Sequence, residues 1–252
     1  MFDTSLQDTF VSYGLSHILA VIVVSVVIAL VIIFKKQLRN ERLFNKFRIT
    51  LAVLILLQEL SLHIFRIWNG TWSLATALPL HLCGLAVLST AYVLLFQDKK
   101  YFYATFFVMM IGATLALLTP SIEGGYGFPH YRFFQFFISH GLIMINFTFI
   151  LFVMDYQKDM KYKYLLYNFF SLAAFALFDL AVNFAVGGNY MYLMAKPGPN
   201  TAFDLFGEHP WYLINIFLFG IPVFFHIYYL PFFVKYLVLT HKNKELKNEY
   251  AN

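Results

Sequence analysis

Seven long apolar runs constrain the fold of this chain more than any other feature of its sequence. They cover residues 18–34, 49–68, 78–96, 101–119, 133–154, 164–186 and 211–237. Each run is long enough to cross about 30 Å of hydrocarbon as a helix that rises about 1.5 Å per residue. A composition of 60% hydrophobic and 12% charged residues excludes an ordinary soluble domain. The sequence therefore predicts an all-α, multi-pass membrane protein in which residues 1–252 form a single seven-helix transmembrane domain.

The basic residues predict how these helices are oriented. Lys and Arg are frequent after the first, third, fifth and seventh runs, whereas the opposite face carries only Arg66, Arg132 and Lys196. Because segments rich in Lys and Arg stay in the cytoplasm, we expect the N-terminus outside and the C-terminus inside a cell membrane. The net charge of +5 then suits anionic lipid headgroups, and no nucleic-acid partner is expected.

Two loops on the predicted outer face differ from the short, basic inner ones. Residues 120–132 and 187–210 are rich in Gly and Pro, which favours turns over continuous helix. The second loop is long enough to cover a cavity. Aromatic residues near the run ends, among them Trp72, Tyr131 and Tyr190, fit interfacial belts. Surface or interface positions are expected for His17, His130, His209 and His241.

The polar side chains within the runs gather towards the outer face. Ionisable groups are costly in hydrocarbon and tend to face a bundle interior or a water-filled cavity. At about 1.5 Å per residue, the layer lies roughly 7 to 13 Å below the outer run ends. It contains Cys83, His63, His140, Asp179 and Glu59, with Arg66, His81, Arg132, Gln135, Asn183 and Asn215 closer to the surface. We expect the functional site in this layer.

Cys83 is the candidate nucleophile of this layer, and as the only cysteine it cannot form an internal disulfide. Pro79 is well placed to start the helix, and a helix N-terminus, a histidine or a positive charge favours a reactive thiolate. Gly84 is expected to leave the sulfur accessible. In a regular helix His81 points about 200° away from Cys83, so the base is expected to be His140 or His63.

Four groups of residues follow one another between about residues 48 and 236. They are Leu80-His81-Leu82-Cys83-Gly84, Ser139-His140-Gly141 within 134–142, residues 189–193 with Lys196-Pro197, and His209-Pro210-Trp211-Tyr212. In this order they resemble the YwaF-like family of bacterial membrane proteins, whose eukaryotic relative is transmembrane protein 164. The resemblance implies a seven-helix fold. It also implies a phospholipid acyltransferase whose cysteine and histidine correspond to Cys83 and His140.

The predicted reaction moves fatty acyl chains between phospholipids or lysolipids of the outer leaflet. Cys83 attacks a glycerophospholipid ester to form a thioester, and a lysolipid hydroxyl accepts the acyl group while His140 moves the proton. His63 is a reserve base, and Glu59, which shares its helix face, would orient it. The predicted substrate-binding residues are Arg66, Arg132, Gln135, Asp179, Asn183 and Asn215. No cofactor and no bound metal are expected, and the oligomeric state stays open.

Two other functions fit part of this pattern. A metal-dependent lipid hydrolase would draw its ligands from His63, His81, His140 and Glu59 or Asp179. The sequence lacks the His-x-x-x-His or His-Glu-x-x-His spacing that is typical of such sites. A transporter or a non-catalytic scaffold would also be hydrophobic. A transporter, however, is expected to have internal repeats and a site near the midplane, whereas this polar layer lies near one face.

Overall fold

The computed structural model describes residues 9–196 and 202–223, together with the single residues 225, 226, 230, 234 and 238. Its secondary structure is helical, apart from an isolated antiparallel bridge between Thr9 and Tyr126. Five helices in this described part are long and apolar enough to cross a membrane. They are α1 (Leu15–Ile33), α3 (Glu41–Trp68), α5 (Lys99–Leu118), α6 (Tyr131–Thr148), which continues as a π-helical turn (Phe149–Val153), and α7 (Tyr164–Val186). The prediction of an all-α protein with several apolar helices is confirmed.

The third and seventh apolar runs form shorter helices than the sequence predicted. The seventh run begins as α8 (Trp211–Asn215) and continues through a π-helical turn (Ile216–Gly220) to Val223. Most of its predicted remainder, residues 224–237, lies outside the described residues. The third run forms α4 (Leu82–Phe96), whose first residue comes four positions later than predicted.

Tertiary hydrogen bonds explain the late start of α4. The Leu78 N–H donates to the Tyr190 hydroxyl at 3.0 Å, and that hydroxyl donates to the Leu74 carbonyl at 2.7 Å. Residues 78–81 therefore fold back over the helix start instead of continuing it. Gly84 makes this possible, because a Cβ there would lie 2.7 Å from the Pro79 backbone. Its missing side chain accommodates Pro79, whereas the sequence suggested that it exposes the sulfur.

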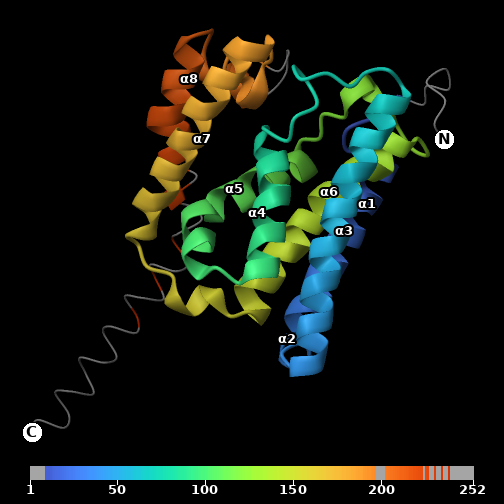
Figure 1. Cartoon of the computed structure of the whole chain (residues 1–252), viewed down its shortest axis with the longest axis vertical. Coiled ribbons are helices and arrows are strands. Elements are labelled where there is room, and N and C mark those ends of the chain that lie inside the picture. The colour runs from blue at the N-terminus through green and yellow to red at the C-terminus, as the bar shows by residue number, and fades with distance from the viewer. Residues whose placement is uncertain are drawn as a thin grey trace, which may run out of the picture.

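The helices form one bundle with two flanks. Figure 1 shows α1, α3 and α6 on one flank, α4 and α5 in the middle, and α7 with α8 on the other flank. The contacts agree, since α4 and α5 pack on each other and on α6, and α7 packs on α5. Residues 69–81 and 119–130 cross the upper end of this view, which we call the loop end. Helix α2 (Lys35–Leu38) lies at the opposite end, the α2 end.

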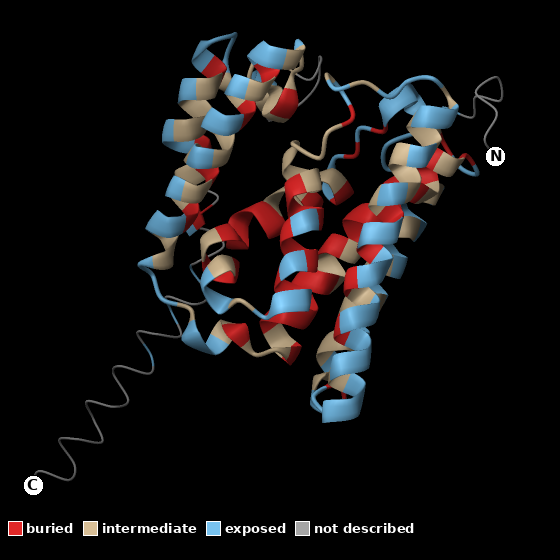
Figure 2. Cartoon of the chain, viewed as in Figure 1, coloured by how far each residue is buried: buried red, intermediate tan, exposed pale blue. Residues whose placement is uncertain are grey.

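Burial is concentrated in the middle of the bundle. Figure 2 shows buried residues mainly on α4, α5 and α6, whereas α1, α3 and α7 expose long stretches. The main core cluster contains Phe102, Phe106, Phe107, Phe147 and Phe149. Many exposed residues are large and apolar, such as Leu57 on α3 and Leu177 and Phe178 on α7. An apolar surface of this extent suits hydrocarbon better than water.

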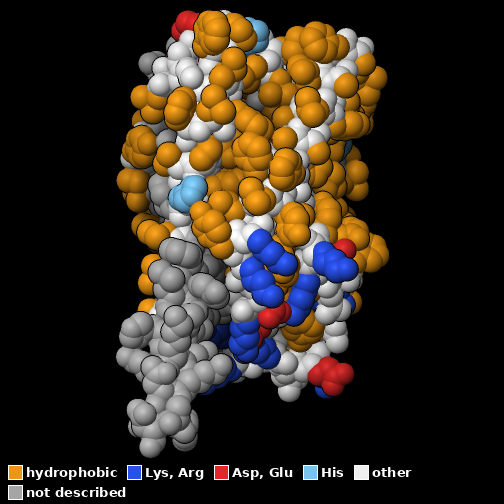
Figure 3. All heavy atoms as spheres, turned by 90° about the vertical axis from the view of Figure 1, so that its left-hand side faces the viewer, with side chains coloured by type: hydrophobic (Ala, Val, Ile, Leu, Met, Phe, Trp, Pro, Cys, Tyr) orange, Lys and Arg blue, Asp and Glu red, His pale blue; other side chains and the backbone are white. Residues whose placement is uncertain are grey.

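Basic side chains gather at the α2 end. Figure 3 shows Lys and Arg below a broad hydrophobic surface. Lys99 pairs with Asp159 at 2.9 Å, and Arg39 pairs with Asp155 at 3.1 Å. The buried Arg48 donates to the carbonyl oxygens of Leu94 and Leu95. Arginine thereby satisfies the last-turn carbonyls of α4, which have no partner within the helix.

Candidate functional site

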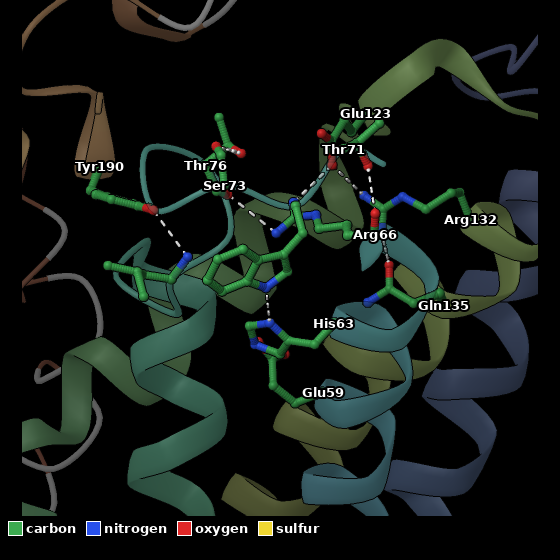
Figure 4. A network of polar contacts seen from close by, with 12 residues as sticks. Glu59, His63, Arg66, Thr71, Ser73, Thr76, Glu123, Arg132, Gln135 and Tyr190 are labelled. Carbon is green, nitrogen blue, oxygen red and sulfur yellow. Dashed lines mark hydrogen bonds and ion pairs between the residues drawn. The ribbon is translucent and has the colours of Figure 1, made fainter. Parts of the chain in front are cut away.

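Two guanidinium groups share one carboxylate at the loop end of the bundle. Glu123 Oε2 accepts hydrogen bonds from Arg66 Nη2 at 2.8 Å and from Arg132 Nη2 at 3.2 Å. Arg132, which is 7% exposed, also donates to the side chain of Gln135 (Figure 4). Two positive charges thus share the one carboxylate to which they are hydrogen-bonded, and Glu59 lies near enough to both arginines for electrostatic interaction. Guanidinium groups in such a site fit a phosphate.

Glu123 was missed by sequence reasoning. It lies in a short 3-10 turn (Glu123–Gly125), where it is the only acidic residue of the loop 120–132. Partial burial by itself would raise the pKa of Glu123, but the Arg66 hydrogen bond and the charges of Arg66 and Arg132 hold this pKa below its ordinary value. The signal that could have found it was one acidic residue on the face that carries Arg66 and Arg132.

His63 is held between Glu59 and Trp72. Its Nε2 atom lies 3.7 Å from Glu59 Oε1, and its Nδ1 atom accepts a hydrogen bond from Trp72 Nε1 at 3.0 Å (Figure 4). An indole N–H can only donate. In the neutral ring Nδ1 therefore carries the lone pair and Nε2 carries the proton. The lone pair that a base needs is thus occupied by Trp72, which the sequence assigned to an interfacial aromatic belt.

His140 has the opposite arrangement. Its Nδ1 atom lies 2.7 Å from the Phe136 carbonyl oxygen, four residues earlier in α6. A carbonyl oxygen can only accept, so Nδ1 carries the proton and Nε2 carries the lone pair. The ring is buried and contacts the Phe136 ring, with centroids 4.3 Å apart. Among the described residues none donates a hydrogen bond to Nε2.

Cys83 is the second residue of α4. Its sulfur packs against α5 at Gly112, where an added Cβ would lie 3.3 Å from Sγ. Glu59 and Tyr192 are close enough to Cys83 for electrostatic interaction. Within the described part of the chain, no hydrogen bond joins the sulfur to a histidine. The sequence did not identify Gly112, although only a residue without a side chain leaves this room for the thiol.

A shared packing cluster sets Glu59, Cys83 and His140 at one level of the bundle. The cluster consists of Ile55 on α3, Ala86, Val87 and Ala91 on α4, Ala113 on α5 and Ile143 on α6. One turn nearer the loop end, Glu59 follows Ile55, Cys83 precedes Ala86, and His140 precedes Ile143. Residues three or four apart share a helix face. The three residues therefore lie at a similar level, about 5 Å from the cluster towards the loop end.

Two predicted substrate-binding amides stabilise the loop 187–210. Asn183 Nδ2 donates to the Tyr190 carbonyl at 3.0 Å, and its Oδ1 accepts from the Tyr190 N–H at 2.7 Å. Asn215 Nδ2 donates to the Phe206 carbonyl at 2.9 Å. Asp179 lies one turn from Asn183 on α7 and is fully buried. Neither of its carboxylate oxygens has a partner among the described residues, so the structure does not group Asp179 with the arginines.

Three aromatic or histidine residues are more buried than the sequence suggested. Tyr190, expected at an interface, has no exposed surface and bonds to residues 74 and 78. His17 contacts the Leu117 carbonyl oxygen at 2.9 Å, and the His130 ring stacks on Tyr126. The surface prediction was wrong for both histidines, because Leu117 covers His17, and Tyr126 and Phe65 of α3 cover His130. His209 is exposed as expected, and His241 lies outside the described residues.

The structure does not bring together the residues that were considered as ligands of an alternative metal site. In the described ranges, no group of three His, Cys, Asp or Glu side chains is placed to hold a metal ion. His81, one expected ligand, packs against the rings of Tyr190 and Tyr192, with centroids 5.4 and 5.1 Å away. It precedes α4 as its N-cap residue in an extended conformation. The angle of about 200° expected between His81 and Cys83 in a regular helix therefore does not apply.

Comparison with known proteins gives one match. No curated protein and no solved structure matches the sequence. The model of the TMEM164 family matches residues 12–228, a range that includes all the candidate site residues and the five long helices. The chain therefore belongs to the TMEM164 family.

Proposed function

We propose that this protein transfers fatty acyl chains between glycerophospholipids and lysophospholipids through a thioester on Cys83. The observation that supports the proposal is that Cys83 and His140 each lie one helical turn from the same packing cluster, while no described residue donates a hydrogen bond to His140 Nε2. The resemblance of the motifs around both residues to a phospholipid acyltransferase supports the same roles. A missing Cys83–His140 hydrogen bond is compatible with them, because catalytic hydrogen bonds often form only when the substrate is bound.

The first half-reaction acylates the protein. His140 Nε2 takes the thiol proton while the Cys83 sulfur attacks the carbonyl carbon of a lipid ester. A carbon–sulfur bond forms, the ester carbon–oxygen bond breaks, and the departing lysolipid oxygen receives the proton from the imidazolium. The products are the Cys83 thioester and a lysophospholipid.

The second half-reaction returns the acyl group to a lipid. The hydroxyl of another lysophospholipid gives its proton to His140 Nε2 and attacks the thioester carbonyl. The carbon–sulfur bond breaks, and the sulfur of Cys83 regains the proton from the imidazolium. His63 acts as a positioning residue rather than as the base, because Trp72 occupies its lone pair. It keeps the Glu59 carboxylate in place beside the site.

The two arginines at the loop end suit the phosphate of the same lipid. Arg66 and Arg132 share the Glu123 carboxylate, and both guanidinium groups can also donate to an incoming phosphate. Gln135 accepts from Arg132 and so orients its guanidinium. In a glycerophospholipid the esters lie just below the phosphate. A phosphate at the loop end therefore directs an ester towards the level of Cys83.

We further propose seven membrane crossings in the cell membrane, with α4 and α8 completing the five longer helices. Helix α4 spans about 22 Å at 1.5 Å per residue. This is short of a full bilayer core, and the folded segment 69–81 completes the crossing above it. The basic α2 end suits the cytoplasmic side. The loop end then faces outward and the proposed site lies in the outer leaflet.

Acylation of the sole cysteine tests the proposal directly. Purified protein in lipid nanodiscs is incubated with a phosphatidylcholine whose acyl chain carries a terminal alkyne, and its intact mass is measured. We expect one acyl group on the wild type, removed by hydroxylamine, and none on Cys83→Ala. Unfolding curves and gel-filtration profiles that match the wild type verify that the variant is folded.

The fate of the label separates transfer from hydrolysis. Addition of a lysophospholipid is expected to release the acyl group as a new phospholipid, whereas water alone is expected to release it slowly. Lipid remodelling that persists undiminished in Cys83→Ala would refute the proposed nucleophile. Release only as free fatty acid would refute transfer and indicate a lipid hydrolase.

A further inference from the structure

An apolar cavity of about 530 Å³ lies between α5, α7 and α8. Its walls include Val108 and Ile111 of α5, Leu172 and Ala176 of α7, and Phe217 and Ile221 after the start of α8. Protein interiors are normally packed with few voids larger than a water molecule. A cavity of this size falls within the range of about 300 to 1,000 Å³ that is usual for small-molecule sites. It therefore has room for a ligand.

The cavity adjoins Cys83. Leu82, the residue before Cys83, lines it. The sulfur packs at Gly112, and the preceding residue of α5, Ile111, also lines the cavity. The cavity wall thus contains a chain neighbour of Cys83 and a chain neighbour of the residue against which its sulfur packs.

Described residues of the loop 187–210 cover one side of the cavity. They are Met191, Leu193, Phe203 and Phe206. The position of this cover is set by Asn183, which binds the Tyr190 backbone, and by Asn215, which binds the Phe206 carbonyl. The two amides that the sequence assigned to substrate binding thus hold the wall of an apolar cavity.

We propose that this cavity binds one acyl chain of the lipid substrate while the ester carbonyl meets Cys83, an inference that rests on the proposed function. The lining consists of aliphatic and aromatic side chains, which suits an acyl chain. A phosphate or an amine there would be desolvated without a partner, at a high energetic cost. The bound lipid therefore contacts two regions of the protein. Its phosphate lies at Arg66 and Arg132, and one acyl chain lies between α5, α7 and α8.

A second apolar cavity provides an internal control. It has a volume of about 630 Å³ and lies between α1 and α6, lined by Ala20, Val23, Phe134 and Gly141 among others. None of its lining residues belongs to α4 or α5. Neither Cys83 nor its chain neighbours line this cavity, although its size and polarity suit an acyl chain equally well. Position relative to Cys83 distinguishes the two cavities.

Filling each cavity with the same substitution tests the inference. Ala176→Phe adds a ring inside the cavity next to Cys83, and Ala20→Phe adds one inside the control cavity. We expect Ala176→Phe to lower kcat/KM for long chains relative to short chains by about tenfold or more. Ala20→Phe is expected to keep the wild-type chain-length profile. An altered profile in Ala20→Phe with a wild-type profile in Ala176→Phe would overturn the assignment.

A binding experiment separates this inference from the proposed reaction. Cys83→Ser protein in nanodiscs is irradiated with a phosphatidylcholine that carries a diazirine midway along one chain, and the cross-linked peptides are mapped. We expect cross-links on α5, α7 and α8 that disappear when Ala176→Phe is added. Such cross-links without a wild-type thioester would refute the reaction but keep the chain site. A wild-type thioester with cross-links only on α1 and α6 would refute the chain site.

Discussion

Helices α6 and α7 are both apolar and of similar length, but they pack differently. Helix α6 is buried along most of its length, and its candidate residues Arg132, Gln135 and His140 all make hydrogen bonds. Helix α7 buries only Asn168, Leu172, Asp179 and Asn183. Each helix borders an apolar cavity, of about 630 Å³ beside α6 and about 530 Å³ beside α7, so the two helices differ in burial. The close packing of α6 suits groups that must be held in a fixed geometry. The lower burial of α7 suits an element that faces lipid chains of variable length.

Sequence explains part of this difference. Along α6, bulky Phe133, Phe136 and Phe137 fill the space around the polar residues. Along α7, Ala176 leaves space on the face that it shares with Leu172 and Asp179. Large side chains thus pack around the polar residues of α6, whereas Ala176 is a small residue in the wall of the cavity beside α7.

The largest expected effect is on the rate of thioester formation when His140, the proposed base on α6, is replaced. His140→Gln is expected to slow Cys83 thioester formation by about a hundredfold to ten-thousandfold, because the free Nε2 lone pair is lost. His63→Gln is expected to cost less than about tenfold, since the lone pair of His63 is already bound by Trp72. Single-turnover acylation with the alkyne lipid measures both rates. The reverse order would transfer the role of base to His63.

A smaller effect is expected from the loop anchor on the α7 side. Asn183→Ala leaves a buried N–H and a buried carbonyl of Tyr190 without partners. The expected loss of unfolding free energy is about 2 to 4 kcal/mol, measured by denaturant unfolding in detergent micelles.

Asp179→Asn is the matched control for this loss. It lies one turn away on the same helix face and makes no hydrogen bond to a described residue. We expect it to leave stability unchanged or to raise it, because it removes an unpaired buried carboxyl group. If both variants lose the same unfolding free energy, then this part of α7 tolerates no substitution. That result would contradict the anchoring role of Asn183.

The smallest effect concerns the shared carboxylate at the loop end. The pKa of Glu123 lies below its ordinary value of 4.5, so its ion pairs stabilise the fold fully above that pH and lose their effect as pH falls through the lowered value. Glu123 is 57% exposed in its side chain, which limits the contribution to about 1 kcal/mol or less. Thermal unfolding of wild type and Glu123→Gln should therefore differ at pH 7 and converge on acidification. A difference that stays constant down to pH 3 would contradict this account.

Much of the helix pattern was predictable from hydrophobicity. The predicted run 164–186 coincides with α7, and the runs for α1, α5 and α6 begin within a few residues of the observed helices. Helix α3 begins eight residues earlier than its run, because charged residues at 41–48 extend it beyond the apolar part. Hydrophobic length identifies where a chain can be buried in lipid, but a helix can continue past that limit.

The candidate site was predictable only in part. Helical spacing grouped Glu59 with His63 and Arg132 with Gln135, and both pairs are in contact in the structure. Glu123 and Trp72 were not found, because they lie in loops whose positions depend on distant segments. The surface prediction for His17 and His130 was wrong because Leu117 and Phe65, both distant in sequence, and the nearby Tyr126 cover the two rings.

Apolar run lengths and the spacing of polar residues established an all-helical membrane protein with a polar layer near one end, since both properties depend on neighbours within one helix. The folded chain decided which nitrogen of each histidine is free, where α4 begins, and which cavity adjoins Cys83. Each of these depends on side chains far apart in sequence, such as Tyr190 with Leu78 and Cys83 with Gly112. Contacts of this kind arise only when the helices pack, so the order of residues along the chain did not reveal them.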